Sequence, residues 1–208
     1  MVQHPAVDEL LNFTRGTHGD VIEKPALKVL RQNQPAERLS PLAGGEQPRA
    51  PNGWEVLSAV VDSGATITAI HPKSAKAYKV HESEASRKGV TYETAASEDL
   101  VNLGEKLYAV LTAEGTLRGF HSQVAEVSSP LASVRQLLGS KHCVLFGLGE
   151  NEEEHLIINK ITGEVNRMRD DGVNYLHDML VVPQDMVNEV QDRINSGASP
   201  FHGPGYGR

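Results

Sequence analysis

The apolar run Val56–Val61, interrupted only by Ser58, ends directly in the tripeptide Asp62-Ser63-Gly64. Its first half alternates in polarity, whereas Ala59-Val60-Val61 is unbroken, and this change predicts a strand that becomes buried on both faces. A sheet must therefore form around this strand. The acidic tripeptide must lie where the strand leaves the core.

Short alternating segments separated by turn residues continue along the chain. The segment 90–94 alternates, 95–99 is small and polar, and 100–103 is apolar again, which predicts a hairpin with a tip of small residues. Residues 130–139 change to helical spacing, with Pro at the start and Gly at the end. Further strands are expected at 106–112, 117–127, 143–146, 155–158 and 175–182. About eight short strands with one or two helices predict a mainly β barrel or sandwich.

Both ends of the chain have the composition of unpacked segments. Residues 1–53 are largely polar and rich in Pro and Gly, and 196–208 holds four Gly and two Pro. Aromatic residues make up only 5% of the 208 residues, which is lean for a chain that packs throughout. A narrow apolar stripe along 183–195 predicts a short helix before the C-terminal tail.

The net charge and the cysteine content exclude several kinds of partner and site. A net charge of −7 argues against nucleic-acid and membrane-surface partners, because those surfaces attract basic proteins. No apolar stretch is long enough to span a membrane, and the N-terminus lacks the pattern of a signal peptide. Cys143 is the single cysteine, which excludes an intrachain disulfide and any multi-cysteine metal site. We therefore expect an intracellular protein, cytoplasmic or nuclear, without a metal or cofactor.

The tripeptide alone has two interpretations. It is how an aspartic protease presents its acid, but it also fits a local turn in which Asp62 bonds its own backbone two residues on. The other Asp-Gly pair, Asp171-Gly172, lacks the hydroxyl and follows no apolar strand, so it predicts a hairpin turn.

The order of several further motifs resembles one protease family. The motifs that follow Asp62-Ser63-Gly64-Ala65 are Gly89–Ala95, Asn102–Glu105, Pro130-Leu131-Ala132-Ser133-Val134-Arg135-Gln136-Leu137, Val144-Leu145-Phe146, Thr162-Gly163-Glu164 and Tyr175-Leu176. In this order they resemble the retropepsin-type aspartic protease region of retrotransposon polyproteins, including the copia type. The resemblance covers roughly Trp54 to Pro183. Two features depart from the family pattern: Ala132-Ser133 stands near a position usually held by Gly, and the hairpin tip has no glycine.

The resemblance implies a mainly β, retropepsin-like acid-protease barrel with one short helix. It divides the chain into a largely disordered segment 1–53, a protease domain 54–150, a β-hairpin extension 151–183 resembling a pre-integrase segment, and a short helix with a disordered tail at 184–208.

The same resemblance implies a catalytic mechanism for which this chain supplies one acid, Asp62. Peptide hydrolysis by carboxylates needs two acids that share a proton, so a homodimer must bring Asp62 against its own image. Ser63 would bond across to the other subunit, Gly64 would leave room for the partner carboxylate, and Ala65 and Thr66 would line the turn. The hairpin tip would cover an extended peptide or polyprotein substrate through Thr94, Ala95, Ala96 and Ser97.

Two alternatives remain open from the sequence. The chain can be a catalytically inactive retropepsin-like module for dimerisation or peptide binding, an interpretation that the glycine-free hairpin tip favours. The isolated chain can also remain monomeric. A Cys-His protease has no local signature in this sequence, since His142 and Cys143 are neighbours that point to opposite faces of a strand.

Overall fold

The computed structural model describes residues 50–51, 53–94, 97, 99–149 and 153–200. All of them belong to the second of the chain's two structural units, Pro41–Arg208. The segment predicted to be disordered, 1–53, therefore lies mostly outside the described residues, as do the tip residues Ala95 and Ala96 and the last part of the tail, 201–208.

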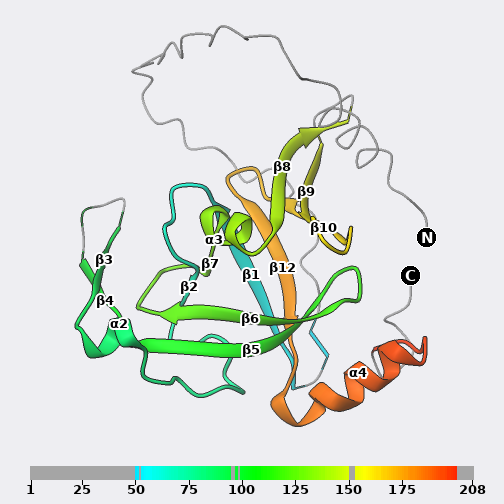
Figure 1. Ribbon diagram of the computed structural model, residues 1–208, viewed down its shortest axis with the longest axis horizontal. Coiled ribbons are helices and arrows are strands. Elements are labelled where there is room, and N and C mark those ends of the chain that lie inside the picture. The colour runs from blue at the N-terminus through cyan, green and yellow to red at the C-terminus, as the bar shows by residue number, and fades with distance from the viewer. Residues whose placement is uncertain (1–49, 52, 95–96, 98, 150–152, 201–208) are drawn as a thin grey trace, which may run out of the picture. The chain divides into compact units, whose positions relative to one another are not determined.

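Six of the described strands close into a barrel, because the first and last of them pair with each other (Figure 1). The order around the barrel is β1 (Glu55–Asp62), β7 (Leu131–Ser133), β2 (Ala69–Ile70), β6 (Leu117–Val124), β5 (Gly104–Thr112) and β12 (Tyr175–Val181). The closing pair is antiparallel and places Glu55 opposite Val181 and Val60 opposite Leu176. The mainly β, barrel-type fold expected from the sequence is confirmed at this level.

β1 has one buried and one half-buried face. Leu57, Ala59 and Val61 pack into the core of the barrel, whereas Ser58 and Val60 are only half-buried. The prediction of burial on both faces was wrong for this strand. In a small barrel only the inner face of each strand is packed on all sides, and the outer face is covered where other segments lie on it.

The segment expected to be helical from Pro130 begins as a strand. β7 pairs in parallel with β1, so that Ser133 lies opposite Asp62. The Val60 N–H also donates to the Pro130 carbonyl at 2.9 Å, which holds this segment extended. The helix α3 (Val134–Gly139) starts only after the strand ends. As a result, the start of α3 and the acid at the end of β1 lie at the same place in the fold.

The two strands of the predicted hairpin are present and pair with each other. β3 (Thr91–Glu93) and β4 (Asp99–Val101) pair in an antiparallel two-stranded sheet, with Tyr92 opposite Leu100. The hairpin follows α2 (Glu84–Arg87), a four-residue helix that Ser83 caps at its N-terminus.

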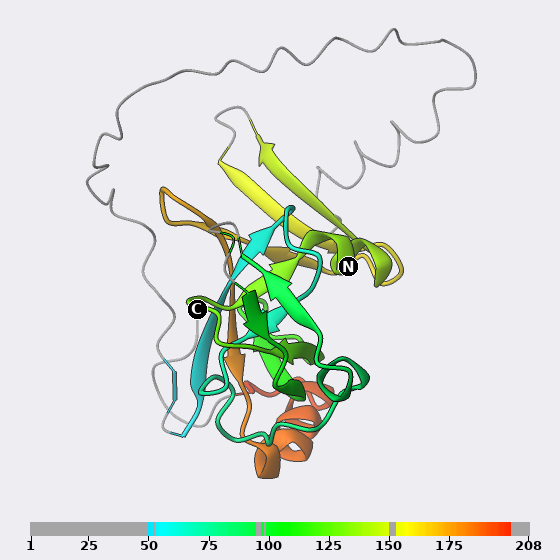
Figure 2. The same ribbon diagram turned by 90° about the vertical axis from the view of Figure 1, so that its left-hand side faces the viewer.

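A second sheet of three strands lies beside the barrel. It consists of β8 (His142–Leu148), β9 (Glu154–Asn159) and β10 (Val165–Arg167), with β9 in the centre, and β8 and β9 project beyond the barrel in Figure 2. We expected residues 151–183 to form a hairpin extension. β9 and β10 do pair, but Tyr175–Val181 returns to the barrel, because most of its side chains are buried and complete the core. The short strand β11 (Arg169–Asp170) joins it through the turn predicted at Asp171-Gly172.

The C-terminal part of the described chain covers one end of the barrel. A short 3₁₀ helix, η1 (Gln184–Met186), leads into α4 (Val187–Asn195), as the apolar stripe predicts (Figure 1). Val190 of α4 is only 1% exposed and packs with Leu111 of β5 and Leu180 of β12. Of the helices that the structure describes, none has the length and apolar character needed to cross a membrane.

Candidate active site

Asp62 is the last residue of β1, and its side chain is partly exposed. The Gly64 N–H donates to Asp62 Oδ1 at 2.7 Å, so the local turn bond that the tripeptide favours is present. Among the described residues, Asp62 Oδ2 and the exposed hydroxyl of Ser63 have no hydrogen-bond partner. The turn therefore fixes one carboxylate oxygen and leaves the other free to meet an incoming group.

Gly64 leaves room for the carboxylate in this turn. A Cβ atom built at this position would lie 3.2 Å from Asp62 Oδ1, which is closer than ordinary contacts between side chains allow. A larger residue here would push the carboxylate away from the backbone N–H that orients it.

Ser133 anchors the loop that follows the acid. Its side chain is fully buried, and its Oγ donates to the Ala65 carbonyl at 2.6 Å. Its backbone N–H donates to Thr68 Oγ1 at 3.1 Å, and the same Oγ accepts from the Gln136 N–H as the N-cap of α3. Gln136 completes the connection by accepting the Thr68 N–H at 2.9 Å. Three hydrogen bonds thus tie the acid loop, residues 62–68, to Ser133 and Gln136 at the start of α3.

The sequence analysis named neither Ser133 nor Gln136 as a site residue. Their spacing, Ser-Val-Arg-Gln, is the capping-box pattern that marks a helix N-terminus. That pattern could have identified Ser133 as a cap, but not its bond to a loop far back in the sequence.

The acid loop and the hairpin β3–β4 line one groove of about 870 Å³. Asp62, Gly64, Ala65 and Thr66 form its side at the acid, and Tyr92, Glu93, Thr94 and Leu100 form its side at the hairpin. Its remaining wall comes from Ile67, Ala69, Leu131 and the segment 126–129. The structure therefore places Asp62, Gly64, Ala65, Thr66 and Thr94 around one groove. Ser63 and Ser97 do not line this groove, and Ala95 and Ala96 lie outside the described residues.

Asn102 holds the base of the hairpin. This side chain is 3% exposed, and its Nδ2 donates to the Tyr92 hydroxyl and to Gln123 Oε1, while its Oδ1 accepts the Gly104 N–H at 2.7 Å. One buried amide thus joins the hairpin to β5 and β6 of the barrel, so the groove has a fixed wall on the hairpin side.

A second recess of about 430 Å³ lies beside Asp62 and Ser63. Its other walls include Phe146 of β8 and Val173 of the β11–β12 turn. Phe146 is 42% and Val173 78% exposed, so apolar surface lies open next to the acid.

The single cysteine does not fit a catalytic role. Burial raises the pKa of the Cys143 thiol, an effect that outweighs the nearby Lys160. A nucleophilic cysteine needs its pKa lowered so that the thiolate forms near neutral pH. The described part of the chain also contains no group of three or more His, Cys, Asp or Glu side chains that could hold a metal ion.

One buried histidine of the barrel has a pKa below its ordinary value. His177 of β12 is 6% exposed, and neither ring nitrogen has a hydrogen-bond partner among the described residues. Burial lowers the pKa of His177 to about 4, and His142 adds to this effect while Asp178 opposes it.

Comparisons of this chain with protein-family models, with curated proteins and with solved structures find no match.

Replacing Ser133 by Ala should loosen the acid loop. The change removes the donor to Ala65 and the cap of α3, and we expect a loss of about 1–2 kcal/mol in the free energy of unfolding. Hydrogen exchange at the amides of 64–68 should become faster. Ser83→Ala is the matched control, because Ser83 caps α2 in the same way but makes no contact with the acid loop. Equal protection of these amides in the two variants would contradict the anchoring role.

Acid should destabilise the fold through His177. Its pKa is lower in the folded chain than the ordinary 6.5, so the unfolded chain takes up the proton first as the pH falls. Stability is therefore lost between about pH 6.5 and pH 4, by up to about 3 kcal/mol. Urea unfolding of wild type and His177→Leu across this range should show the wild type losing more stability than the variant. Parallel pH profiles would contradict this assignment.

Proposed function

We propose that this chain is an aspartic endopeptidase of the retropepsin type, active as a homodimer in which two copies of Asp62 form the catalytic pair. The observation that carries the proposal is the groove shared by the Asp62 loop and the hairpin. An acid and a hairpin that line the same groove are the parts needed to hold an extended peptide against a carboxylate.

The placement of Asp62 suits a shared proton. Oδ1 is held by the Gly64 N–H, and Oδ2 at the end of β1 has no hydrogen-bond partner in the described structure. When a second carboxylate lies about 3 Å away, both cannot be ionised, so one proton is shared between them. One acid then removes a proton from the attacking water, and the other gives a proton to the peptide carbonyl oxygen. The resulting tetrahedral intermediate collapses when the leaving nitrogen is protonated.

The anchoring of the acid loop supports the same function. A catalytic acid must keep its orientation while substrates enter and leave, and the bonds from Ser133 and Gln136 provide this without using the carboxylate itself. Ala132-Ser133, which departs from the retropepsin pattern, thus contributes a hydrogen-bonded anchor at that position.

The charge of the groove indicates the substrate. The acidic residues Asp62, Glu93 and Glu126 line it without any Lys or Arg, and Tyr92, Leu100 and Leu131 supply apolar wall. We expect flexible peptides with apolar and basic side chains, such as the linkers of a retrotransposon-type polyprotein, to bind better than acidic ones.

The surface next to the acid supports self-association. Phe146 and Val173 are exposed at the recess that contains Asp62 and Ser63. A two-fold axis passing beside Asp62 would bring this apolar surface against its own copy and remove it from water.

The rival function is a module that binds peptides in the same groove without cleaving them. It needs the groove and the hairpin but not an ionisable residue at position 62, so substitution of the acid separates the two functions.

Asp62→Asn should abolish peptide cleavage without unfolding the protein. At about pH 5.5–6, where His177 is still neutral, we expect cleavage of fluorogenic peptides with apolar and basic residues to fall by about 10²–10⁴-fold. Asp170→Asn is the matched control, because Asp170 makes the same local bond: its Oδ1 accepts the N–H of Gly172, two residues later in the chain, at 2.7 Å. If wild type binds such peptides but cleaves none at micromolar protein concentration, the binding module replaces the protease.

Dimer formation should depend on Val173. Val173→Lys places a charge on the apolar surface beside Asp62 and should weaken the dimer at least about tenfold. Ile161→Lys is the matched control, since Ile161 is 77% exposed against 78% for Val173 but lies at the β9–β10 turn. Sedimentation equilibrium of the three proteins at micromolar concentration measures the effect. Equal weakening in both variants would exclude the Val173 surface as the dimer interface.

A further inference from the structure

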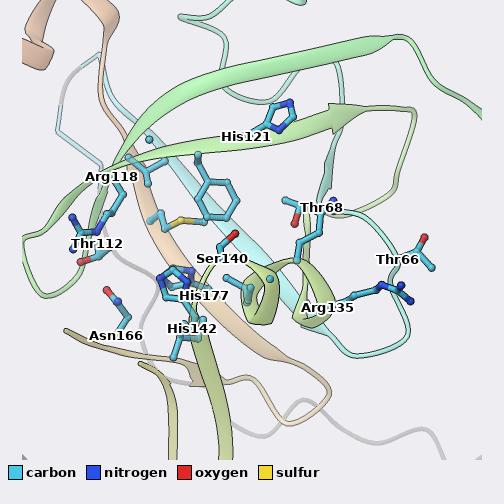
Figure 3. Close-up of a pocket in the computed structure, with 18 residues that line it drawn as sticks. Thr66, Thr68, Thr112, Arg118, His121, Arg135, Ser140, His142, Asn166 and His177 are labelled. Atoms are coloured by element: carbon cyan, nitrogen blue, oxygen red, sulfur yellow. Dashed lines mark hydrogen bonds between the residues drawn. The ribbon is translucent and has the colours of Figure 1, made fainter. Parts of the chain in front are cut away.

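A separate cavity of about 670 Å³ lies between the barrel, α3 and the three-stranded sheet. Figure 3 shows its labelled side chains in two groups. His142, His177, Asn166 and Arg118 lie on one side, and Arg135, Thr66 and Thr68 on the other. The cavity has the size of a small-molecule site, and it does not include Asp62.

Polar atoms without partners gather at the first side of this cavity. His177 and Asn166 are each 6% exposed, and both nitrogens of His177 and Oδ1 of Asn166 lack hydrogen bonds among the described residues. His142 Nδ1 is also buried without a hydrogen bond among the described residues. Buried polar groups normally have a hydrogen-bond partner. A buried group without one loses its favourable interaction with water and gains no bond in exchange. Three such side chains around one cavity indicate that it is shaped for a polar occupant.

The charge of the cavity wall indicates whether the ligand is an anion or a cation. Arg118 and Arg135 line it together with His121, His142 and His177, and none of the described Asp or Glu residues does so. The chain as a whole has a net charge of −7, so this wall is an exception to its surroundings. The guanidinium of Arg118 is paired with the Glu164 carboxylate, which holds it in place and compensates part of its charge, so Arg135 and the histidines carry the rest of the argument for an anion. Anions are therefore favoured here over neutral or cationic ligands.

The rest of the wall is apolar. Phe120, Leu137, Ile157 and Met179 line the cavity between its two polar sides. An inorganic ion alone would leave this surface without contacts, whereas an aromatic or aliphatic body would cover it.

We propose that this cavity binds a small organic anion, a carboxylate or phosphate monoester on an apolar body, with the anionic group among His142, His177 and Arg118. In this position both imidazoles donate to the anion, and the apolar body lies against Phe120, Leu137 and Met179. The proposal does not depend on proteolysis, because it uses neither the groove nor the acid.

The occupant would also touch the anchor of the acid loop. Thr68 and Gln136 line the cavity and bond to each other, and Thr66 lines both this cavity and the groove. A bound anion would therefore restrain the loop from the side opposite the substrate.

Binding should become tighter as the pH falls from about 6.5 toward 4, because an anion beside His177 favours its protonated form, whereas burial lowers the pKa of this group in the empty cavity. The charged and titratable groups around His177 are His142 on β8, Arg118 on β6 and Asp178 on its own strand. Asp178 is paired with Arg169 and Ser58, so its charge is already compensated before an anion binds.

The test uses the full chain and four probes: benzoate, phenyl phosphate, benzamide and inorganic phosphate, each at millimolar concentration. Thermal shift and the NMR signals of the imidazole groups report binding. We expect benzoate or phenyl phosphate to raise Tm and to shift the signals of His142 and His177. Benzamide lacks the charge and inorganic phosphate lacks the apolar body, so both should bind at least about tenfold more weakly. The stronger of the two organic anions identifies the ligand as a carboxylate or a phosphate monoester.

Two variants localise the effect. His177→Leu should lower the affinity for the better anion by about tenfold or more and remove most of its pH dependence, whereas His71→Leu, outside the cavity, should leave both unchanged. Arg135→Gln changes an exposed side chain and cannot unfold the core, and it should weaken binding several-fold. Equal binding of benzamide and benzoate, no response to either organic anion, or the same loss in His71→Leu would overturn the proposal.

Discussion

The buried hydroxyl of Ser133 is the contact on which the candidate active site depends. Ser133 is the last residue of β7, and its hydroxyl caps α3 and donates to the carbonyl of Ala65. One side chain therefore joins a barrel strand, a helix and the acid loop. β7 in turn pairs in parallel with β1, which places Ser133 opposite Asp62. The position of the acid loop therefore depends on strand pairing in the barrel as well as on the local turn at Gly64. A loop held only by local bonds would let the acid move with each encounter.

The acid loop also separates two cavities of opposite character. Among the described residues, the charged side chains that line the groove on the hairpin side are acidic, whereas those that line the cavity on the α3 side are basic. Thr66 lines both. Ligands of opposite charge can therefore occupy the two sides of one loop without competing, and each restrains the same backbone. This arrangement gives the proposed catalytic loop a physical route for regulation by a small molecule.

The parts of the site that local patterns describe could be predicted, and those that depend on distant pairing could not. The apolar run before Asp62 marks the end of β1, and period-two alternation locates the hairpin. Alternation does not say which strands become neighbours, which is why Tyr175–Val181 was assigned to an extension rather than to the barrel. The partners of Ser133 lie 65 and 68 residues away in sequence, beyond the reach of any local pattern. His177 shares a face of β12 with Met179, so alternation could have placed it inside, but not beside His142.

Closure of the barrel has a consequence for how the chain is made. β1 is among the first barrel residues to leave the ribosome, and its partner β12 is the last. Until Val181 has been synthesised, β1 and β5 each present an unpaired edge, and such edges recruit strands from other chains. Newly made protein therefore passes through a stage that needs protection from aggregation, and removal of the C-terminal strand would leave the nascent form permanently in that stage.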